Sequence, residues 1–568
     1  MKASDAVAKF LAKHEINYCF ELIGGMITHL IDSMLLEGKT KIVSMHHEQS
    51  AAFAAEGIAR QSRGKMVAVA MGTSGPGATN LITGIGSCWF DSVPCLFLTG
   101  QVNTGEMRGS RAIRQQGFQE MDVVEVVRSI TKFSIRIDHV EDLLPMLHFA
   151  LSTALSGRMG PVLIDIPNDI QRMDIDSTLV EVWLARPFSD AEQAPVLSDA
   201  AMSTVLSLCK STLKPLVLIG GGARWADSLP GWLQQLNNVS VPYVTTLMGH
   251  EQVTQSPSYF GMIGAYGCRA ANWAVQNCDL LLVLGSRLDV RQTGADVKDF
   301  ARCAKVIQID IDPAQLNNRV LADFSLVADT ESFLRISPPP NVLFANVSDT
   351  WLNEIEVVRR QAEQDEYPDW PISPTRLFAA INQVFHDMPV DYVCDVGNHQ
   401  MWAANLIRLS SRQTIHYSGG MGAMGFALPA AIGINLGSNA RTIVFTGDGS
   451  LQINIQELDT IVRLDLNIAV IVLNNFFLGM VKNFQDMYFD GRNRSTAEGY
   501  SCPSFAEVGK AYGLRTVVVE SIVAAERAIV DLHDTVGPVL IEIIMKGASE
   551  CRPRLAYGSS LDKQYPPL

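Results

Sequence analysis

The sequence predicts an α/β protein made of three doubly wound domains, each with a central parallel sheet. Three observations support this prediction: short apolar runs recur along the chain, most of them end in glycine or a polar turn, and most precede a helical pattern. This alternation is typical of parallel sheets covered by helices on both faces. The runs lie at 65–72, 93–100, 160–167, 214–222, 278–286, 304–312, 441–449, 466–475 and 537–545.

Two polar stretches interrupt the alternation, at 172–198 and 336–374. Their proline and charge content is typical of connections between domains. A weak similarity between MVAVAMGTSGPGATN and RTIVFTGDGSLQIN hints that the first and third domains arose by duplication. We therefore expect domains at 1–175, 195–335 and 372–550, followed by a C-terminal tail at 551–568.

The composition is that of a large globular protein in a reducing compartment. Of 568 residues, 47% are hydrophobic and 18% are charged, which is enough to build several buried cores. The net charge of −14 argues against nucleic acid or an anionic membrane as the main partner, because phosphate binding needs clustered Lys and Arg. The apolar runs are too short to span a bilayer. Ten scattered cysteines without a CxxC pair, and an N-terminal amphipathic helix in place of a signal peptide, predict a cytoplasmic protein with reduced thiols.

The segment FTGDGS places an acidic side chain in a tight turn at the end of a predicted strand. Its glycines allow a phosphate to approach the backbone, and the helix that follows favours an anion at its N-terminus. Asn475 ends the next predicted strand, so parallel pairing brings its amide beside Asp448. A carboxylate, an amide oxygen, a backbone carbonyl and phosphate oxygens suit Mg²⁺. A plain Gly-Asp turn is the alternative for the motif alone, but the paired strand ends favour a metal site.

These motifs belong to a wider set that resembles the acetohydroxyacid synthase (acetolactate synthase) family of thiamine-diphosphate (ThDP) enzymes. The resemblance implies that the first domain binds the ThDP pyrimidine, the third its diphosphate with Mg²⁺, and the middle one FAD. It also implies a homodimer or homotetramer with each active site between two subunits. The matching motifs are HHEQSAAFAAEGIAR (46–60), GTSGPGATN (72–80), FQEMDVVEVVRSITK (118–132), GPVLIDIPND (160–169), DVGNHQMWAA (395–404), SGGMGAMGFALPAAIG (418–433), GDGSLQINIQEL (447–458) and VLNNFFLGMV (472–481).

The resemblance also implies roles for individual residues. Glu48 matches the glutamate that activates the aminopyrimidine, a role that burial favours by raising a carboxyl pKa. Met424 matches the residue that bends ThDP, and Phe118 and Gln119 match residues near the reacting carbon. Taken alone, Glu48 also fits an exposed helix glutamate, and Met424 a core methionine. The further ThDP positions are Gly397, Asn398, His399, Gly422, Gly447, Asp448, Gly449, Ser450, Asn475, Leu478, Gly479 and Met480, and the metal ligands are Asp448, Asn475 and Phe477.

In the middle domain, IGGGAR, TTLMGH, GMIGAYG, GSRLDVRQTG, QIDIDP and VAD resemble the family's FAD pocket. The reaction involves no net redox change, so the flavin would be structural. Arg291 also matches an arginine that grips the acceptor's carboxylate, with a flavin-side or interdomain salt bridge as the alternative. The implied FAD positions are Gly220, Gly221, Gly222, Thr246, Leu247, Met248, Gly264, Ala265, Gly285, Arg287, Asp289, Arg291, Asp310, Ile311 and Asp329.

Three departures from the family pattern concern the acceptor substrate. The run at 101–117 is longer than usual and adds three arginines. Phe484 stands where the family usually has a tryptophan that shapes the acceptor pocket, and Asn168 stands where it usually has lysine. These departures indicate a larger and less acidic acceptor than a second 2-keto acid.

We therefore expect a ThDP-dependent carboligase, a transferase that decarboxylates pyruvate and passes the acetyl unit to a ketone, giving a tertiary alcohol. Two segments resemble carboligases of deoxysugar pathways: the RQQGFQE loop and the C-terminal RPRLAYGSSLDKQYPP. The loop begins with Arg114 and is preceded by Arg108 and Arg111. One of these carboligases acts on a CDP-linked 4-keto-3,6-dideoxyhexose in yersiniose synthesis, which predicts a nucleotide-linked 4-keto-deoxysugar as acceptor.

The alternative is acetolactate synthesis from two pyruvates. Simple decarboxylation is disfavoured because 87–138 lacks the histidines that decarboxylases of this superfamily use to protonate the enamine. A flavin-dependent oxidase and a non-catalytic scaffold are further alternatives. Intact Glu48, Asp448 and Asn475 argue against the scaffold.

Overall fold

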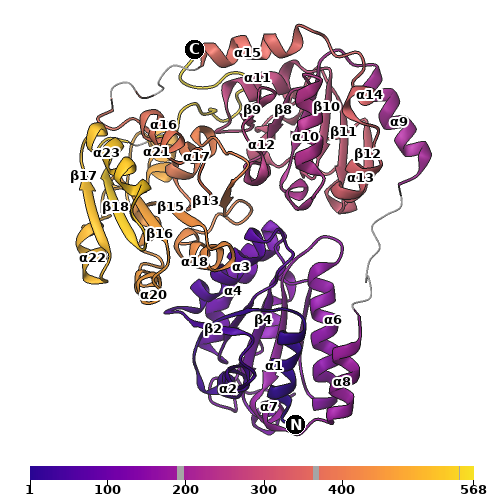
Figure 1. Ribbon diagram of the computed structural model, residues 1–568, viewed down its shortest axis with the longest axis vertical. Helices are drawn as coiled ribbons and strands as arrows, with labels where there is room; N and C mark the ends of the chain where they lie inside the picture. The colour runs from indigo at the N-terminus through magenta and orange to yellow at the C-terminus, as the bar shows by residue number, and fades with distance from the viewer. Residues whose placement is uncertain (188–196, 363–366, 368–369, 549, 568) are drawn as a thin grey trace.

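The computed structural model describes residues 1–187, 197–362, 367, 370–548 and 550–567, which form three α/β domains (Figure 1). Each domain is built on a six-stranded parallel sheet, so the predicted fold class is confirmed. Each predicted apolar run contains a strand. Residue 195, where the middle domain is expected to begin, and residue 568 lie outside the described residues. In the part of the chain that is described, no helix is long and apolar enough to cross a membrane.

In the first domain the sheet order is β2-β1-β3-β4-β6-β5, and β3, β4 and β6 are buried along their whole length. Continuous burial explains why these strands read as unbroken apolar runs. The elements are α1 (Ala3–Lys13), β1 (Tyr18–Leu22), α2 (Thr28–Glu37), β2 (Lys41–Ser44), α3 (Glu48–Gln61), β3 (Val69–Gly72), α4 (Pro76–Asp91), β4 (Leu96–Gln101), α5 (Val123–Val127), β5 (Phe133–Arg136), α6 (Leu143–Leu155), β6 (Val162–Pro167), α7 (Asn168–Arg172) and α8 (Ser177–Ala185).

The middle domain has the order β12-β11-β10-β7-β8-β9. Read from β9, this is the arrangement of dinucleotide-binding folds, which bind ligands where the order of strand addition reverses, here between β7 and β10. The elements are α9 (Asp199–Lys210), β7 (Pro215–Ile219), α10 (Leu229–Asn238), β8 (Tyr243–Thr245), β9 (Tyr259–Met262), α11 (Arg269–Asn277), β10 (Leu280–Leu284), α12 (Val290–Thr293), β11 (Lys305–Asp310), β12 (Phe324–Val327), α13 (Thr330–Ile336), α14 (Pro340–Leu343) and α15 (Trp351–Gln361).

The third domain has the order β14-β13-β15-β16-β18-β17, the same as the first once the strands are counted within each domain. β3 and β15 hold equivalent places, as the internal sequence similarity suggested. The elements are α16 (Pro374–Phe385), β13 (Val390–Cys394), α17 (Asn398–Leu406), β14 (Gln413–Tyr417), α18 (Ala427–Ser438), β15 (Arg441–Gly447), α19 (Asp448–Leu451), α20 (Glu457–Arg463), β16 (Ile468–Asn474), α21 (Gly479–Tyr488), α22 (Phe505–Ala511), β17 (Arg515–Val519), α23 (Ile522–His533) and β18 (Val539–Ile544).

The two stretches expected to be connections are partly helical. In α8, the Asp176 side chain caps the first turn and Val180 is buried in the core of the first domain. In α15, Trp351 and Ile355 are buried, and the indole of Trp351 donates to the carbonyl of Pro215 at 2.9 Å. Apolar residues at helical spacing within polar sequence form these helices, which the overall polarity of the stretches concealed.

Helices α3 and α18 pack together at the junction of the first and third domains (Figure 1). A Cβ on Gly433 would lie 1.9 Å from the carbonyl oxygen of Ala54, and a Cβ on Gly57 would lie 2.3 Å from that of Ala430. Only glycine allows the two backbones to approach so closely. The small residues that follow Glu48 therefore serve a contact within the chain.

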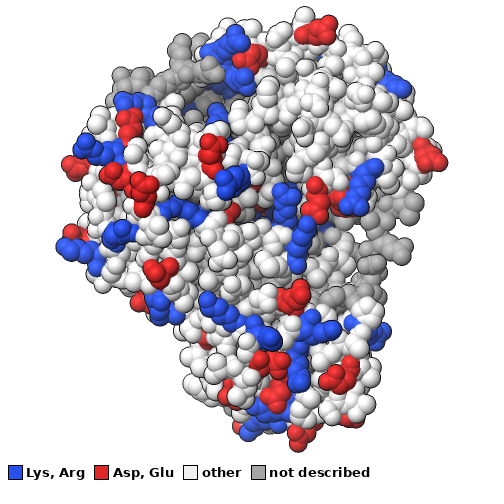
Figure 2. Space-filling model, in the orientation of Figure 1, with Lys and Arg blue, Asp and Glu red and all other residues white. Residues whose placement is uncertain are grey.

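On the face seen in Figure 2, acidic and basic side chains are interspersed.

Candidate active site

The carboxyl ends of β15 and β16 bring Asp448 and Asn475, the two metal ligands predicted to act through their side chains, to the same edge of the third sheet. Gly447 pairs in register with Leu473, so Asp448 and Asn475 follow adjacent strands. Asp448 is 2% exposed, and burial raises its carboxyl pKa to about 6. The Asn475 amide nitrogen donates to the carbonyl of Ala548 at 2.8 Å, which orients the side chain and keeps its oxygen available to the turn. That oxygen accepts the backbone N–H of Phe477 at 3.3 Å.

Two glycines and two buried polar side chains from α17 lie beside these ligands. A Cβ on Gly479 would lie 2.4 Å from Asn398 Nδ2, and a Cβ on Gly447 would lie 3.1 Å from the His399 ring. Asn398 Nδ2 and His399 Nε2 are buried and have no hydrogen-bond partner among the described residues. Burial also lowers the pKa of His399 to about 3, so its ring is neutral. Buried polar atoms without partners are rare, and a bound polar group would satisfy them.

The remaining predicted ThDP positions surround the same cluster. A Cβ on Gly449 would lie 2.3 Å from Leu478 Cδ2 and 3.3 Å from Met424 Cε, so both side chains reach the turn after Asp448. Gly422 has a φ of 67°, which favours glycine. The Ser450 side chain has a backbone partner of its own, since its hydroxyl donates to the carbonyl of Val396 at 2.8 Å. Gly397 precedes α17, and Met480 lies partly buried on α21.

Glu48 begins α3 and is 5% exposed, unlike an ordinary surface glutamate. Asn80 Nδ2 donates to its Oε2 at 2.9 Å, and its Oε1 is 3.2 Å from where a Cβ on Gly77 would lie. Gln119 has a φ of 65° and packs against Gly75. Among the described residues, no hydrogen bond joins Glu48 to Asp448 or Asn475.

The residues predicted to meet the acceptor lie in different places. Phe118 is 79% exposed, and Phe484, on α21, is 54% exposed with its ring centroid 4.8 Å from that of Tyr488. Arg291 lies on α12 in the wall of the middle-domain cavity. None of the described hydrogen bonds or ring contacts brings these three side chains together.

The loop at 101–117 is ordered by hydrogen bonds to carboxylates. Glu120 accepts the backbone N–H groups of Arg108 and Gln116, both at 2.7 Å. Asp169, next to the predicted Asn168, accepts the backbone N–H and hydroxyl of Thr104 at 3.0 and 2.6 Å. The loop is therefore fixed against α7 and leaves Arg111 and Arg114 exposed.

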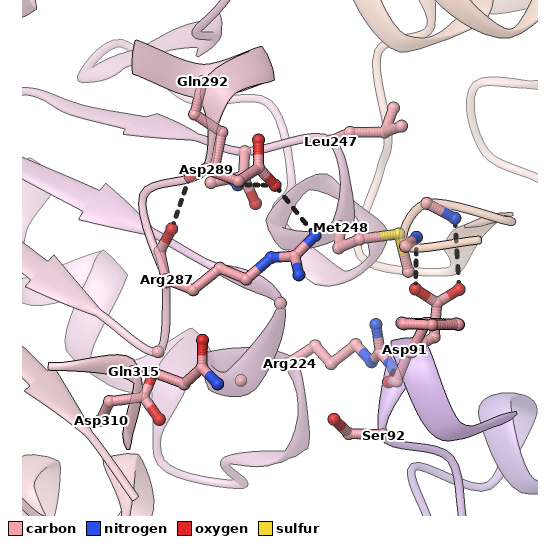
Figure 3. Close-up of a pocket in the computed structure, with 18 of the residues that line it drawn as sticks. Asp91, Ser92, Arg224, Leu247, Met248, Arg287, Asp289, Gln292, Asp310 and Gln315 are labelled. Atoms are coloured by element: carbon pink, nitrogen blue, oxygen red, sulfur yellow. Dashed lines mark hydrogen bonds and ion pairs between the residues drawn. The ribbon is translucent and has the colours of Figure 1, made fainter. Parts of the chain in front are cut away.

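A cavity opens where the strand order of the middle sheet reverses, between β7 and β10 (Figure 3). Gly220 and Gly264 do not line it. A Cβ on Gly220 would lie 2.2 Å from the carbonyl oxygen of Gly285, and one on Gly264 would lie 2.3 Å from that of Arg291, so these two glycines permit close backbone packing instead. The predicted FAD positions that line the cavity are Gly221, Gly222, Thr246, Leu247, Met248, Ala265, Gly285, Arg287, Asp289, Arg291, Asp310, Ile311 and Asp329.

Several residues around these sites were not predicted. Asp91 and Arg224 enter the cavity wall, where Asp91 accepts the backbone N–H groups of Gly419 and Gly420 at 3.2 and 2.7 Å (Figure 3). Arg224 lies inside the quoted IGGGAR motif, and Asn80 inside GTSGPGATN, so the motifs could have revealed both. Tyr500, which donates to Asp448, lies in a stretch without a motif.

Comparison with known proteins covers nearly the whole chain. The chain matches three family profiles: "Thiamine pyrophosphate enzyme, N-terminal TPP binding domain" at 1–126, "Thiamine pyrophosphate enzyme, central domain" at 202–336, and "Thiamine pyrophosphate enzyme, C-terminal TPP binding domain" at 395–543. It is 34% identical to the acetolactate synthase isozyme 2 large subunit of Escherichia coli, covering 99% of this chain and 98% of that protein. It is 33% identical to a probable acetolactate synthase large subunit of Methanocaldococcus jannaschii (100% and 96%) and 32% identical to an acetolactate synthase large subunit of Cyanidium caldarium (98% and 95%).

Proposed function

Because this chain belongs to the thiamine pyrophosphate enzyme family, as a homologue of acetolactate synthase large subunits, we propose that it is a carboligase that decarboxylates pyruvate and joins the two-carbon unit to a second pyruvate. The observation that carries this proposal is the cluster of Asp448, Asn475, Asn398 and His399 at neighbouring strand ends. The names of the relatives favour acetolactate synthesis over the sugar acceptor that the sequence motifs favoured.

The residues present fit Mg²⁺ and ThDP. Asp448, Asn475 and the carbonyl of Phe477 would hold the cation, because carboxylate and carbonyl oxygens are the ligands it prefers. Asn398 and His399, beside their glycines, would meet the diphosphate. When bound, ThDP would supply a nucleophilic carbon for the pyruvate carbonyl and a sink for the electron pair that decarboxylation releases.

The protein's own groups would control protons and water. The Glu48 carboxyl would exchange a proton with the aminopyrimidine, with Asn80 holding its other oxygen. Met424 and Leu478 would exclude water from the reacting carbon. As the family resemblance implies, we propose that each active site forms between two subunits of a homodimer or homotetramer, with Glu48 from one subunit and Asp448 from another.

The middle-domain cavity fits FAD. Its sheet has the strand order of dinucleotide-binding folds. Gly222 and Gly285, which follow β7 and β10, let the two turns pack backbone to backbone while both line the cavity. Arg287 and Arg291 supply positive charge in its wall, while Asp310 and Asp329 offer acceptors for ribose hydroxyls. The proposed reaction involves no net oxidation or reduction. The flavin would therefore have a structural role, holding the domains in place.

Filling this cavity should therefore displace the flavin. We expect Ala265→Trp to lower the molar ratio of flavin absorbance to protein roughly tenfold, because overpacking of this kind costs ~1–3 kcal/mol. The control is Ala200→Trp, which adds the same side chain on an exposed part of α9. Equal flavin content in the two variants would contradict the assignment of the cavity to FAD.

A nucleotide-linked 4-keto-deoxysugar remains a second candidate acceptor, favoured by one observation. The loop at 101–117 is fixed against α7 and leaves Arg111 and Arg114 exposed, with Arg111 also donating to the carbonyls of Met107 and Arg108. Exposed guanidinium groups on a fixed loop are suited to binding a diphosphate. Phe484, smaller than the usual tryptophan, would leave room for a sugar. Together these features support an acceptor that carries phosphates.

Product analysis separates the two candidates. With pyruvate, ThDP and Mg²⁺ alone, we expect acetolactate as the product, and its absence would contradict acetolactate synthesis. With an added nucleotide 4-keto-sugar, a branched product identified by mass would support the second candidate. In that case, replacing Arg108, Arg111 and Arg114 by alanine should raise KM for the sugar substrate by roughly tenfold or more while KM for pyruvate changes little, since hydrogen bonds to charged groups contribute about 1.5–3 kcal/mol.

A further inference from the structure

Tyr500 reaches the predicted metal site from a segment that carries no motif. Its hydroxyl donates a hydrogen bond to Asp448 Oδ2 at 2.8 Å. Asp448 is almost completely buried at the start of α19, whereas Tyr500 is half-buried. This bond is the one side-chain hydrogen bond to the Asp448 carboxylate among the described residues, and it acts together with the backbone N–H groups of Gly449 and Asn475 that also interact with that carboxylate.

The direction of this hydrogen bond is set by a third side chain. Gln452 Nε2 donates to the Tyr500 hydroxyl at 3.2 Å and to the backbone carbonyl of Asp448 at 3.0 Å. An amide nitrogen can only donate, so the phenol oxygen accepts from Gln452 and its own proton must point to Asp448. Gln452 therefore donates to Tyr500, and Tyr500 donates to Asp448.

The segment that holds Tyr500 is tied to the other half of the metal site. The carbonyl of Thr496 accepts the backbone N–H of Leu478 at 2.9 Å, three residues after Asn475. The thiol of Cys502 donates to Asn474 Oδ1 at 3.6 Å. Residues 496–502 thus contact the turns after both β15 and β16, which keeps Tyr500 in place relative to both ligands.

We propose that Tyr500 is a positioning residue for the divalent cation: it holds one oxygen of Asp448 so that the other is presented to the metal. This inference rests on the proposed function, because it requires a cation at Asp448. Carboxylates that bind metals are commonly held by such outer hydrogen bonds, and loss of the outer partner typically weakens metal affinity 10- to 100-fold.

The test is Tyr500→Phe, which removes the hydroxyl and keeps the ring. We expect the apparent Kd for Mg²⁺, followed by tryptophan fluorescence at saturating ThDP, to rise by about 10- to 100-fold. Electron paramagnetic resonance of Mn²⁺, which counts the free metal directly, should show the same loss. At saturating Mg²⁺ we expect kcat to recover to within a few-fold of wild type, which separates metal positioning from a role in the reaction.

Two variants serve as controls. Tyr512→Phe makes the same change on a tyrosine whose ring packs against the hydrophobic core, and it should leave the Kd for Mg²⁺ unchanged. Gln452→Met removes the donor that orients Tyr500 and should give a smaller loss in the same direction. Thermal melting of the metal-free proteins should be similar for all three, since the proposed role is in metal binding.

The outcomes distinguish this inference from the proposed function. If wild type binds no metal in the presence of ThDP, the proposed function fails. If wild type binds metal and Tyr500→Phe binds it equally well, only the role of Tyr500 is overturned. Tighter metal binding by Tyr500→Phe would also overturn it, because the hydroxyl would then compete with the cation for Asp448.

Discussion

Glu48→Gln is expected to retain ThDP and to lose about 10²–10⁴-fold in kcat. Glutamine has nearly the same shape, and its oxygen can still accept the Asn80 hydrogen bond seen for Glu48 Oε2. It cannot take up or release a proton, so the aminopyrimidine would not be activated. The measurements are steady-state turnover of pyruvate and the affinity for ThDP.

The control for Glu48 is Glu141→Gln, the same change at an exposed position of the first domain, which should leave both quantities unchanged. A second measurement makes the role specific: proton–deuterium exchange at C2 of bound ThDP should slow together with kcat. Normal turnover in Glu48→Gln, or slow turnover with normal exchange, would contradict the assigned role.

How much of the fold the sequence predicted depends on how each strand is buried. β15 and β16 are buried along their whole length and read as unbroken apolar runs, so they were predicted. β2 and β17 lie at sheet edges with several exposed residues, and their mixed sequences were not recognised. The order of the strands follows from contacts between distant segments, which no local pattern records.

The same distinction applies to the candidate site. Asp448 and Asn475 could be predicted because each ends a strand in a recognisable motif. Tyr500 could not, because its role arises from a loop that returns to α19 from 52 residues away. Asp91 is likewise an isolated residue in sequence, and only folding brings it to the backbone N–H groups of Gly419 and Gly420.

Arg60 lies at the centre of a buried ion cluster where the three domains meet. Its guanidinium donates to Glu56 Oε1 and Asp91 Oδ2, both at 2.6 Å, and to Glu251 Oε1 at 2.9 Å. Arg224 pairs with the second oxygen of Glu251 at 3.4 Å. Burial raises the pKa of Glu56 and of Glu251, opposed mainly by the neighbouring arginines. The cluster thus balances three carboxyl groups against two guanidinium groups away from water.

Arg60→Met is expected to destabilise the protein by about 3–5 kcal/mol, because it leaves three buried carboxyl groups with a single cation. Methionine fills similar space, so the loss would come from charge rather than from a cavity. The first unfolding transition, monitored by circular dichroism, should occur at a lower urea concentration than in the wild type. The free energy of unfolding of Arg60→Lys should lie between those of the wild type and of Arg60→Met. One ammonium group cannot bind three carboxylates in the fixed geometry of a guanidinium.

The matched control is Arg128→Met, which removes an arginine that is 67% exposed and pairs with Glu125. Exposed ion pairs contribute little, so we expect a change below ~1 kcal/mol. If Arg60→Met unfolded at the same urea concentration as Arg128→Met, the cluster would not be what holds the domains together. Since Asp91 binds both Arg60 and the backbone of Gly419 and Gly420, Arg60→Met should also weaken ThDP binding, because those glycines precede Gly422 and Met424.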